Sequence, residues 1–399
     1  MQPNTAAPAF SPARMLQEDA DRLGAALDEH LRRHFAPDRE KSLRSFSSSE
    51  VAELLGITPA HLRTMRHEGK LPDVGSEDGR RSLQFTAEEI YRIREALESG
   101  SRKKGRYLPR RKDSEPIQVI AISSFKGGAS KSTTAAHLAA GLAMAGLRVA
   151  VCDLDPQSSI STYYGFSPDI DTENPLTIYD AISFENRQPM AMVMRKTFFH
   201  NIDIAPASLM LAEFEQYAAF HARQGTGEEP WFTRLASAIR SVESSYDVVL
   251  LDCPPALGMI TLSAMVAATS MIIPVVPSMI DVASLSHFTR MSSDMMGTLE
   301  EFGARFDYDF VRYLIARHEP TDGPQAQLAA FLRMQFGERV MASTFLKSTV
   351  ISDAGMTNQT LYEIRRSDVT RSAYDRARES VDAVRDEVLD LLNKAWGRS

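Results

Sequence analysis

The chain has 399 residues, of which 43% are hydrophobic and 24% charged, an ordinary globular composition with room for two or three domains. Its net charge of −7 at pH 7 argues against a protein that coats DNA with a uniformly basic surface. The charge is uneven, since residues up to Glu115 hold 21 Lys and Arg against 19 Asp and Glu. Two cysteines, no apolar leader segment and no membrane-length apolar run favour a cytoplasmic protein over a secreted or membrane-inserted one.

Residues 1–44 are predicted to form an arm that carries one helix. Residues 13–35 show a helical pattern with one apolar side, formed by Met15, Leu23, Leu27 and Leu31. A single amphipathic helix ahead of a domain packs either against a partner chain or on its own domain, and the pattern allows both. We therefore treat this segment as a candidate dimerisation element.

Residues 45–100 show the pattern of two short helices separated by a tight turn. Ser47-Ser-Ser-Glu50 is a capping box that begins the first helix, and Gly56-Ile-Thr58 supplies the turn. Thr58 and Pro59 begin a second helix, which ends at Gly69. This spacing is typical of a helix-turn-helix unit.

The second of these helices is predicted to have a buried apolar side and an exposed basic side. Burial of Leu62 and Met65 would leave four polar residues exposed: His61, Arg63, Thr64 and Arg66. A helix of this kind fits the major groove of DNA. Residues 80–85 are predicted to form one strand of a small wing, and Thr86-Ala-Glu-Glu89 caps a further helix to Leu97. The alternative is a small helical module without a role in DNA binding.

Residues 101–114 are predicted to be a basic linker. Seven basic residues and no acidic one lie between Ser101 and Lys112. Such a segment can contact DNA phosphates. It can equally serve as a solvated hinge, and the two roles are compatible.

Residues 115–399 alternate short apolar segments with helical patterns. Six segments are predicted as strands: 117–123, 148–153, 202–205, 247–251, 271–276 and 309–316. This alternation predicts an α/β domain with a mostly parallel sheet covered by helices on both faces. Ligands of such sheets bind at the carboxyl ends of the strands.

The stretch from Val119 to Thr134 has the order strand, glycine loop, helix. Backbone N–H groups of such a loop and of the helix N-terminus bind phosphate groups. Lys131 is expected to contact the β- and γ-phosphates of ATP, and Ser132 to bind Mg²⁺. The strict P-loop pattern is not met, because Phe125 and Ser130 occupy its two glycine positions. The candidate nucleotide-binding residues are Lys126, Gly127, Gly128, Ala129, Ser130, Lys131, Ser132 and Thr133.

Two further predicted strands end in carboxylates. Asp153 and Asp155 stand at positions i and i+2, which lie on one face of an extended chain, where they can order Mg²⁺-bound or attacking water. Asp252 ends the apolar segment that begins at Tyr246 and is predicted to hold Mg²⁺ through water. The alternative for the first pair is a structural cap after the strand. Phosphoryl transfer from ATP to water is the reaction that fits these residues best.

These motifs resemble a known family. The pattern K-G-G-x-x-K-[ST] from Lys126 to Ser132 and the stretch Asp153-Leu-Asp-Pro-Gln157 are similar to those of the ParA/MinD family of P-loop ATPases. Four later stretches resemble the RepA subgroup of ParA proteins, which serves RepABC plasmid replicons: 251–258, 313–323, 346–354 and 360–363. Residues 45–100 resemble the winged helix-turn-helix of MerR-type proteins, so the likeness covers most of the chain.

The resemblance implies a partition ATPase that hydrolyses ATP as a homodimer. In it, Lys126 would reach the partner's nucleotide, Asp155 would orient the hydrolytic water and Asp153 would support the metal. The family also implies operator binding with repression of its own operon, nonspecific DNA binding in the ATP state, a ParB-like partner and association with the nucleoid. Arg317 and Lys347 are candidates for the nonspecific DNA contact, although both could equally be ordinary surface charges. Ser130 replaces the more common glycine, which puts the turnover rate in question.

Three alternatives to this interpretation remain. A membrane-positioning ATPase of the MinD type should end in a basic amphipathic anchor, whereas the predicted helix at 374–396 mixes acidic and basic residues. A nitrogenase-type reductase needs cluster-ligating cysteines, which Cys152 and Cys253 do not provide. The third alternative is a nucleotide-gated repressor, in which hydrolysis is incidental. The sequence distinguishes it poorly from a partition ATPase, so this alternative stays open.

Overall fold

The computed structural model describes residues 11–34, 41–78, 82–124, 126–128, 130–166, 175–224 and 229–398, without the side chains of 27–34, 77, 78, 82 and 224. It divides into two compact units, residues 1–42 and 43–399. None of the helices in these ranges combines the length and the apolar character that crossing a lipid bilayer requires.

The first unit contains one helix, α1 (Pro12–His34), which confirms the predicted helix at 13–35. Its side chains are exposed throughout residues 11–26, with Leu16 and Leu23 each 62% exposed. The side chains of Leu27 and Leu31 lie outside the described part. Over the described part, therefore, the apolar side of α1 is not buried within its own unit.

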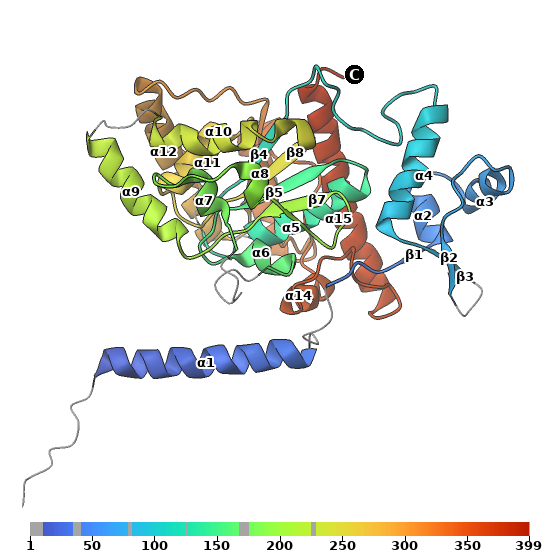
Figure 1. Cartoon of the computed structure of the whole chain (residues 1–399), viewed down its shortest axis with the longest axis horizontal. Helices are drawn as coiled ribbons and strands as arrows, with labels where there is room; N and C mark the ends of the chain where they lie inside the picture. Colours follow the sequence, from blue (N-terminus) through green and yellow to red (C-terminus); the bar gives the residue numbers. More distant parts are fainter. Residues whose placement is uncertain are drawn as a thin grey trace, which may run out of the picture. The chain divides into compact units, whose positions relative to one another are not determined.

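The second unit begins with three helices and a small sheet, which lie together at one end of it (Figure 1). The elements are β1 (Phe46–Ser47), α2 (Ser48–Leu54), α3 (Pro59–His67), β2 (Ser76–Asp78), β3 (Ser82–Phe85) and α4 (Ala87–Gly100). The strands pair antiparallel in the order β1-β3-β2. The three helix starts predicted from sequence are confirmed: capping boxes at Ser47 and Thr86, and a Thr58 N-cap followed by Pro59.

Part of the predicted linker is packed, so the interpretation of this segment as a solvated hinge is wrong for residues 107–111. Tyr107 is buried, and its carbonyl accepts a 3.0 Å hydrogen bond from the buried Arg94 of α4. Arg111 donates to the carbonyls of Tyr246 at 2.8 Å and Glu243 at 2.5 Å. These guanidinium groups satisfy carbonyl groups across the junction, which a solvated hinge would leave to water. Residues 102–106 and 112–114 of this segment are exposed as predicted.

The larger part of the second unit is built on a seven-stranded sheet in the order β10-β9-β4-β8-β5-β7-β6. Its strands are β4 (Gln118–Ile122), β5 (Val149–Asp153), β6 (Arg195–Lys196), β7 (Ile202–Ala205), β8 (Val248–Asp252), β9 (Ser270–Val275) and β10 (Phe310–Ile315). All neighbours are parallel except β6, which pairs antiparallel with β7 at the edge. The six predicted strands are confirmed within about one residue, and β6 was missed because two polar residues carry no periodicity.

Helices cover both faces of this sheet. Those after β4 are α5 (Lys131–Met144), α6 (Ser159–Tyr163), α7 (Ile178–Ile182), α8 (Met190–Val193), α9 (Leu211–Gln224), α10 (Arg234–Arg240), α11 (Met259–Ala267), α12 (Met279–Glu301), α13 (Gly323–Phe336), α14 (Thr349–Met356) and α15 (Arg371–Ala395). Single 3₁₀ turns stand at 231–233, 243–245 and 337–339. Helix α5 crosses from β4 to β5 on one face, as in doubly wound α/β sheets.

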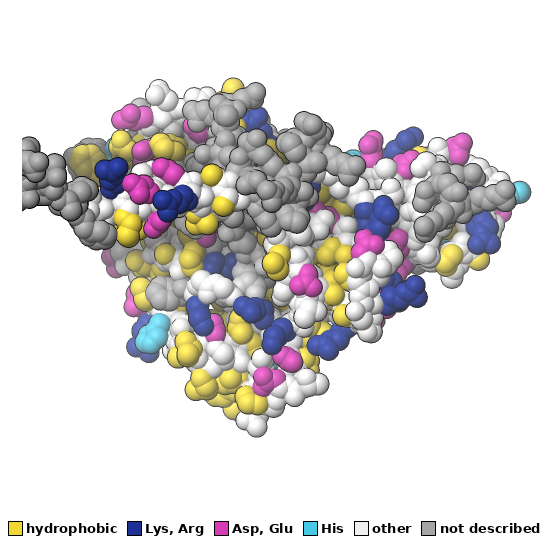
Figure 2. Space-filling view, turned by 90° about the horizontal axis from the view of Figure 1, so that it is seen from below, with side chains coloured by type: hydrophobic (Ala, Val, Ile, Leu, Met, Phe, Trp, Pro, Cys, Tyr) yellow, Lys and Arg dark blue, Asp and Glu magenta, His cyan; other side chains and the backbone are white. Residues whose placement is uncertain are grey.

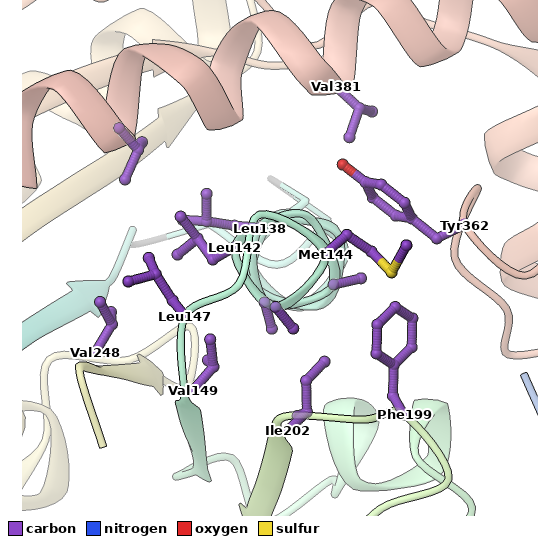
Figure 3. Close-up of a cluster of buried hydrophobic side chains, with 14 of the residues drawn as sticks. Leu138, Leu142, Met144, Leu147, Val149, Phe199, Ile202, Val248, Tyr362 and Val381 are labelled. Atoms are coloured by element: carbon purple, nitrogen blue, oxygen red, sulfur yellow. The ribbon is translucent and has the colours of Figure 1, made fainter. Parts of the chain in front are cut away.

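Helix α5 is the centre of the main core. Figure 3 shows Leu138 and Leu142 of α5 among side chains of the sheet, such as Val149 and Val248, with Val381 of α15 on the other side. Alternate residues of the same strands point to the opposite core, under α7, α9, α10 and α11. Burial on both faces explains why these strands show continuous apolar runs in the sequence.

The C-terminal helix α15 packs on this core. Most of its apolar residues are buried along its length, from Tyr374 to Leu392, and Arg378 pairs with Asp382 at 2.8 Å in a partly buried position over the ring of Tyr362. The helix therefore has no apolar side free for a membrane, as the mixed charge pattern predicted. Close packing around α5 depends on Gly141, where an added Cβ would lie 2.7 Å from Tyr362 Oη and 3.1 Å from Cγ of Arg385 in α15.

Candidate nucleotide site

The loop between β4 and α5 takes the tight path that its sequence predicts. Gly128 has φ +78°, and Ser130, the N-cap of α5, has φ +66° and ψ +26°, a left-handed conformation. Glycine adopts this conformation without strain, whereas a serine there costs on the order of 1–2 kcal/mol. The departure at Ser130 that the sequence showed is thus a position of backbone strain at the start of the helix. Ala129, also predicted to bind nucleotide, lies outside the described residues.

Lys131 begins α5 and turns its side chain back over the loop. It is 7% exposed, and its ammonium donates a 3.2 Å hydrogen bond to the carbonyl of Lys126. Burial lowers the pKa of Lys131, and the nearby carboxylate of Asp252 opposes that shift. A buried cation above exposed Gly127 and Gly128 is what binding of a polyphosphate requires.

Asp252 is a buried carboxylate without a complete set of partners. It ends β8, in register with Ile122 at the end of β4 and with Asp153 at the end of β5. Neither carboxylate oxygen has a hydrogen-bond partner of normal geometry in the described part of the chain. Burial, followed by the charge of Asp153, raises the pKa of Asp252 well above its ordinary value, while Ser132 and Lys131 act to lower it. An orphaned carboxylate of this kind calls for a cation or its bound water.

Asp153, in contrast, is held by the protein. Its Oδ2 accepts from the Ser161 backbone N–H at 2.9 Å and the Ser161 hydroxyl at 2.7 Å. Its Oδ1 accepts from the Asp155 N–H at 3.1 Å. Burial raises the pKa of Asp153, and these hydrogen bonds oppose the shift. The sequence did not single out Ser161, because no spacing rule connects a serine of α6 to the strand before it.

Asp155 lies on the loop that Asp153 shapes. Its Oδ1 accepts from the Gln157 N–H at 2.9 Å, and the residue is 9% exposed. The hydrogen bonds of Asp153 fit the interpretation of this pair as a structural cap after the strand. The roles predicted for Asp153 in metal binding and for Asp155 in catalysis stay predictions.

The carboxyl edge of the sheet suits Mg²⁺ rather than a transition metal. The described residues contain no group of three His, Cys, Asp or Glu side chains that could hold a metal by themselves. Mg²⁺ binds through one or two protein oxygens, with phosphate and water completing its shell. Ser132 and the unpartnered Asp252 fit that requirement. Both cysteines are buried, and burial raises the pKa of Cys152 to about 12, so neither has the character of a nucleophile.

The second lysine of the loop, Lys126, reaches in another direction. Its ammonium forms an ion pair with Asp281 in the first turn of α12, with an Nζ–Oδ2 distance of 2.9 Å. Arg317, predicted as a DNA contact, donates to the carbonyl of Gly128 at 3.4 Å. The sequence missed Asp281, which is 155 residues from its partner. Lys347 pairs with Glu319 at 3.0 Å and its side chain is 57% exposed.

Three of the four candidate DNA-binding residues of α3 are exposed as predicted: His61, Arg63 and Thr64. The prediction that Arg66 is exposed is wrong. Arg66 is half-buried, pairs with Asp73 at 3.4 Å and lies 5.8 Å from the ring of Phe85. Its position at the last turn of α3 brings it over the small sheet. Figure 2 shows Lys and Arg side chains interspersed with Asp and Glu on this end of the unit, at the right of the view.

The site defines a class of protein, the P-loop NTPases whose loop departs from the strict P-loop pattern. Its elements are a strand, a phosphate-type loop with two lysines, a helix, and a buried carboxylate on the neighbouring strand. Comparison with known proteins agrees. A family model described as an AAA domain matches residues 117–301. A protein of Rhizobium rhizogenes named "Putative replication protein A" is 42% identical over 388 residues, covering 96% of this chain and 95% of the relative.

Two further comparisons point the same way. Protein SopA of Escherichia coli is 27% identical over 367 residues, covering 90% of this chain and 91% of SopA. A solved structure described as a partition protein is 17% identical, with a TM-score of 0.66, and covers 97% of this chain and 100% of the other, which shows the shared fold. The chain therefore belongs to the ParA family of P-loop ATPases, in the RepA subgroup of RepABC replicons.

Proposed function

We propose that this protein is a replicon-partitioning ATPase that binds ATP with Mg²⁺ and hydrolyses it as a homodimer. The observation that carries the proposal is Asp252, a buried carboxylate beside Lys131 and Ser132 at the carboxyl edge of the sheet. Neither of its oxygens has a hydrogen-bond partner of normal geometry among the described residues. A protein bears the cost of such a carboxylate where a cation is to be held. Family membership supports the same activity.

Each residue of the site has a distinct role in this proposal. The loop amides and Lys131 bind the triphosphate, and Ser132 with Asp252 holds Mg²⁺, which when bound neutralises charge on the phosphate oxygens. Asp155 orients the attacking water, and Asp153, fixed by Ser161, sets the conformation of the Asp155 loop. Lys126 contacts the nucleotide of the partner subunit, so that hydrolysis requires the dimer.

We further propose that residues 45–100 are a winged helix-turn-helix domain that binds an operator and represses the protein's own operon. The exposed, basic side of α3 carries this proposal, through His61, Arg63 and Thr64. Arg66 acts by holding α3 on the wing sheet. In the ATP state the dimer also binds nonspecific DNA, with Arg317 and Lys347 as candidate contacts, and acts with a ParB-like centromere-binding partner at the nucleoid.

The first experiment is ATP hydrolysis by the purified full chain, with and without nonspecific duplex DNA. Lys131→Ala is expected to lower turnover by at least a hundredfold, because it removes the cation at the transferred phosphoryl group. Lys394→Ala, which removes the same charge from an exposed position of α15, should leave turnover unchanged. Turnover that persists in Lys131→Ala would refute this assignment of the site.

The nucleotide-gated repressor is the second candidate, and the separate basic helix α3 favours it. In that case ATP binding sets the affinity for the operator, and hydrolysis is incidental. Asp155→Ala distinguishes the two, since it should retain ATP binding and lose turnover. Plasmid loss at the wild-type rate in that variant, with operator binding intact, would favour the repressor; rapid loss would favour the partition ATPase.

A further inference from the structure

The ion pair between Lys126 and Asp281 joins the nucleotide loop to the start of α12. Its Nζ–Oδ2 distance is 2.9 Å, and the two side chains are 43% and 9% exposed. Because Asp281 is well buried, salt and water screen its attraction for the Lys126 ammonium less than they would screen an ion pair in open solvent. The paired conformation of Lys126 is therefore favoured more strongly. The contact holds Lys126 against its own subunit.

Asp281 is fixed in place independently of Lys126. Its Oδ2 accepts a hydrogen bond from the hydroxyl of Ser278, the N-cap of α12, and its backbone N–H donates to that hydroxyl at 3.2 Å. A carboxylate in the first turn of a helix is also favoured by the helix dipole. The position of the carboxylate is therefore set by the helix cap, and the lysine comes to it.

The surroundings of the pair direct Lys126 towards α12. The pair borders a small hollow whose wall includes Ser124, Val275, Leu285 and Phe288. The hydroxyl of Ser124 is buried there without a hydrogen-bond partner of normal geometry in the described structure. The apolar wall offers Lys126 no second anion, so Asp281 is the acceptor that determines where its ammonium lies.

We propose that Asp281 is a positioning residue that retains Lys126 within its own subunit and so limits ATP-dependent dimerisation. This inference rests on the proposed function, in which Lys126 contacts the partner's nucleotide. The ammonium cannot serve Asp281 and the partner's phosphates at once, so each subunit must open its pair before the dimer closes. Only a subunit whose Lys126–Asp281 pair is open can form the dimer. The apparent dissociation constant of the dimer is therefore multiplied, once for each subunit, by the inverse of the fraction of subunits in the open state.

The expected magnitude follows from the partial exposure of the pair. An ion pair of this kind shifts an equilibrium by about three- to fivefold. Because both subunits must open their pairs, removing the Asp281 charge should lower the dissociation constant of the dimer by about tenfold or more. Asp281→Asn makes this change and keeps an oxygen that can accept from Ser278.

Two control variants separate charge from helix capping. Ser278→Ala removes the cap hydroxyl but leaves the charge that binds Lys126. Asp294→Asn makes the same charge change further along α12, at an exposed position. If Asp281→Asn acts by releasing Lys126, Asp294→Asn should leave the dissociation constant unchanged, and Ser278→Ala, which keeps the Asp281 charge, should change it by less than Asp281→Asn does. If it acts by loosening the start of α12, Ser278→Ala should have the same effect, and the proposal would be overturned.

The measurement is sedimentation equilibrium of the full chain with Mg²⁺ and ATPγS. A dissociation constant in Asp281→Asn equal to or higher than that of the wild type would refute the proposal while leaving the proposed function intact. Absence of any wild-type dimer would instead refute the proposed function, and this inference with it. Asp281→Ser, which has a capping hydroxyl and no charge, replaces Asp281→Asn if that variant does not fold.

A second readout follows the lysine itself, without nucleotide. Acetylation of Lys126 by a water-soluble succinimidyl ester, measured by mass spectrometry, should be several-fold faster in Asp281→Asn than in the wild type. Asp294→Asn should match the wild type. Equal rates in all three proteins would show that Asp281 does not hold the ammonium and would overturn the proposal.

Discussion

Asp252→Asn should stabilise the protein while destroying its activity. The substitution keeps the shape of a side chain that is 0% exposed and removes a charge whose two oxygens have no partner of normal geometry in the described residues. Relief of an unsatisfied buried charge is worth about 1–3 kcal/mol. For a domain of 150–250 residues each kcal/mol corresponds to roughly 2–4 °C in Tm, and the effect is smaller in this larger unit.

The pH dependence of this gain has a definite sign. The pKa of Asp252 is raised in the folded protein, so folding favours its protonated form and the wild type loses stability as pH rises above the unfolded value of 3.8. The gain from Asp252→Asn should therefore be small near pH 4 and grow as pH rises. Chemical unfolding in a series of buffers without Mg²⁺ and nucleotide measures it.

Asp247→Asn is the matched control at the other end of the same strand. Asp247 is also 0% exposed, but it pairs with Arg148 at 2.7 Å and accepts from the Arg148 N–H at 2.8 Å. Breaking a buried pair from one side costs about 3–5 kcal/mol, so this variant should be destabilised. Loss of stability in Asp252→Asn at pH 7, comparable to that in Asp247→Asn, would refute the claim that Asp252 is an uncompensated charge.

Three further predictions concern the core and the DNA-binding helix. His137 is buried and accepts a hydrogen bond from the Leu361 N–H, and burial lowers its pKa to about 4. The free energy of unfolding should therefore fall by about 3 kcal/mol as pH drops from 6.5 to 4, because the unfolded state takes up a proton that the folded state does not. The fall should be smaller in His137→Gln. An equal fall in both would refute the assignment. Gly141→Ala should cost about 1–3 kcal/mol in urea unfolding, because its Cβ would meet Tyr362 Oη; an unchanged midpoint would contradict this. Arg63→Ala should reduce the salt dependence of duplex binding by about one counterion if it contacts a phosphate, whereas an unchanged slope and affinity would exclude α3 from the interface.

Local signals in the sequence were sufficient for much of the fold. The capping residues Ser47, Thr58 and Thr86 act within three residues of themselves, so their helices could be predicted without tertiary information. The strands were recognisable because both faces of the sheet are buried, which makes each an apolar run. The glycine loop and Asp252 were found because strand ends of a parallel sheet meet at one edge.

Contacts between distant segments were decided by the tertiary structure alone. Three such contacts join elements that no sequence periodicity relates. They are the pairing of Lys126 with Asp281, the hydrogen bonds of Ser161 to Asp153, and the packing of Arg111 on the carbonyl groups near residue 245. The burial of a charged group was likewise decided by the tertiary structure. The type and spacing of charges can be read locally in the sequence, whereas desolvation depends on everything that packs around the group. The residue types at the site were thus readable in order along the chain, but the absence of a partner at Asp252 and the direction in which Lys126 reaches depend on how the sheet and α12 come together.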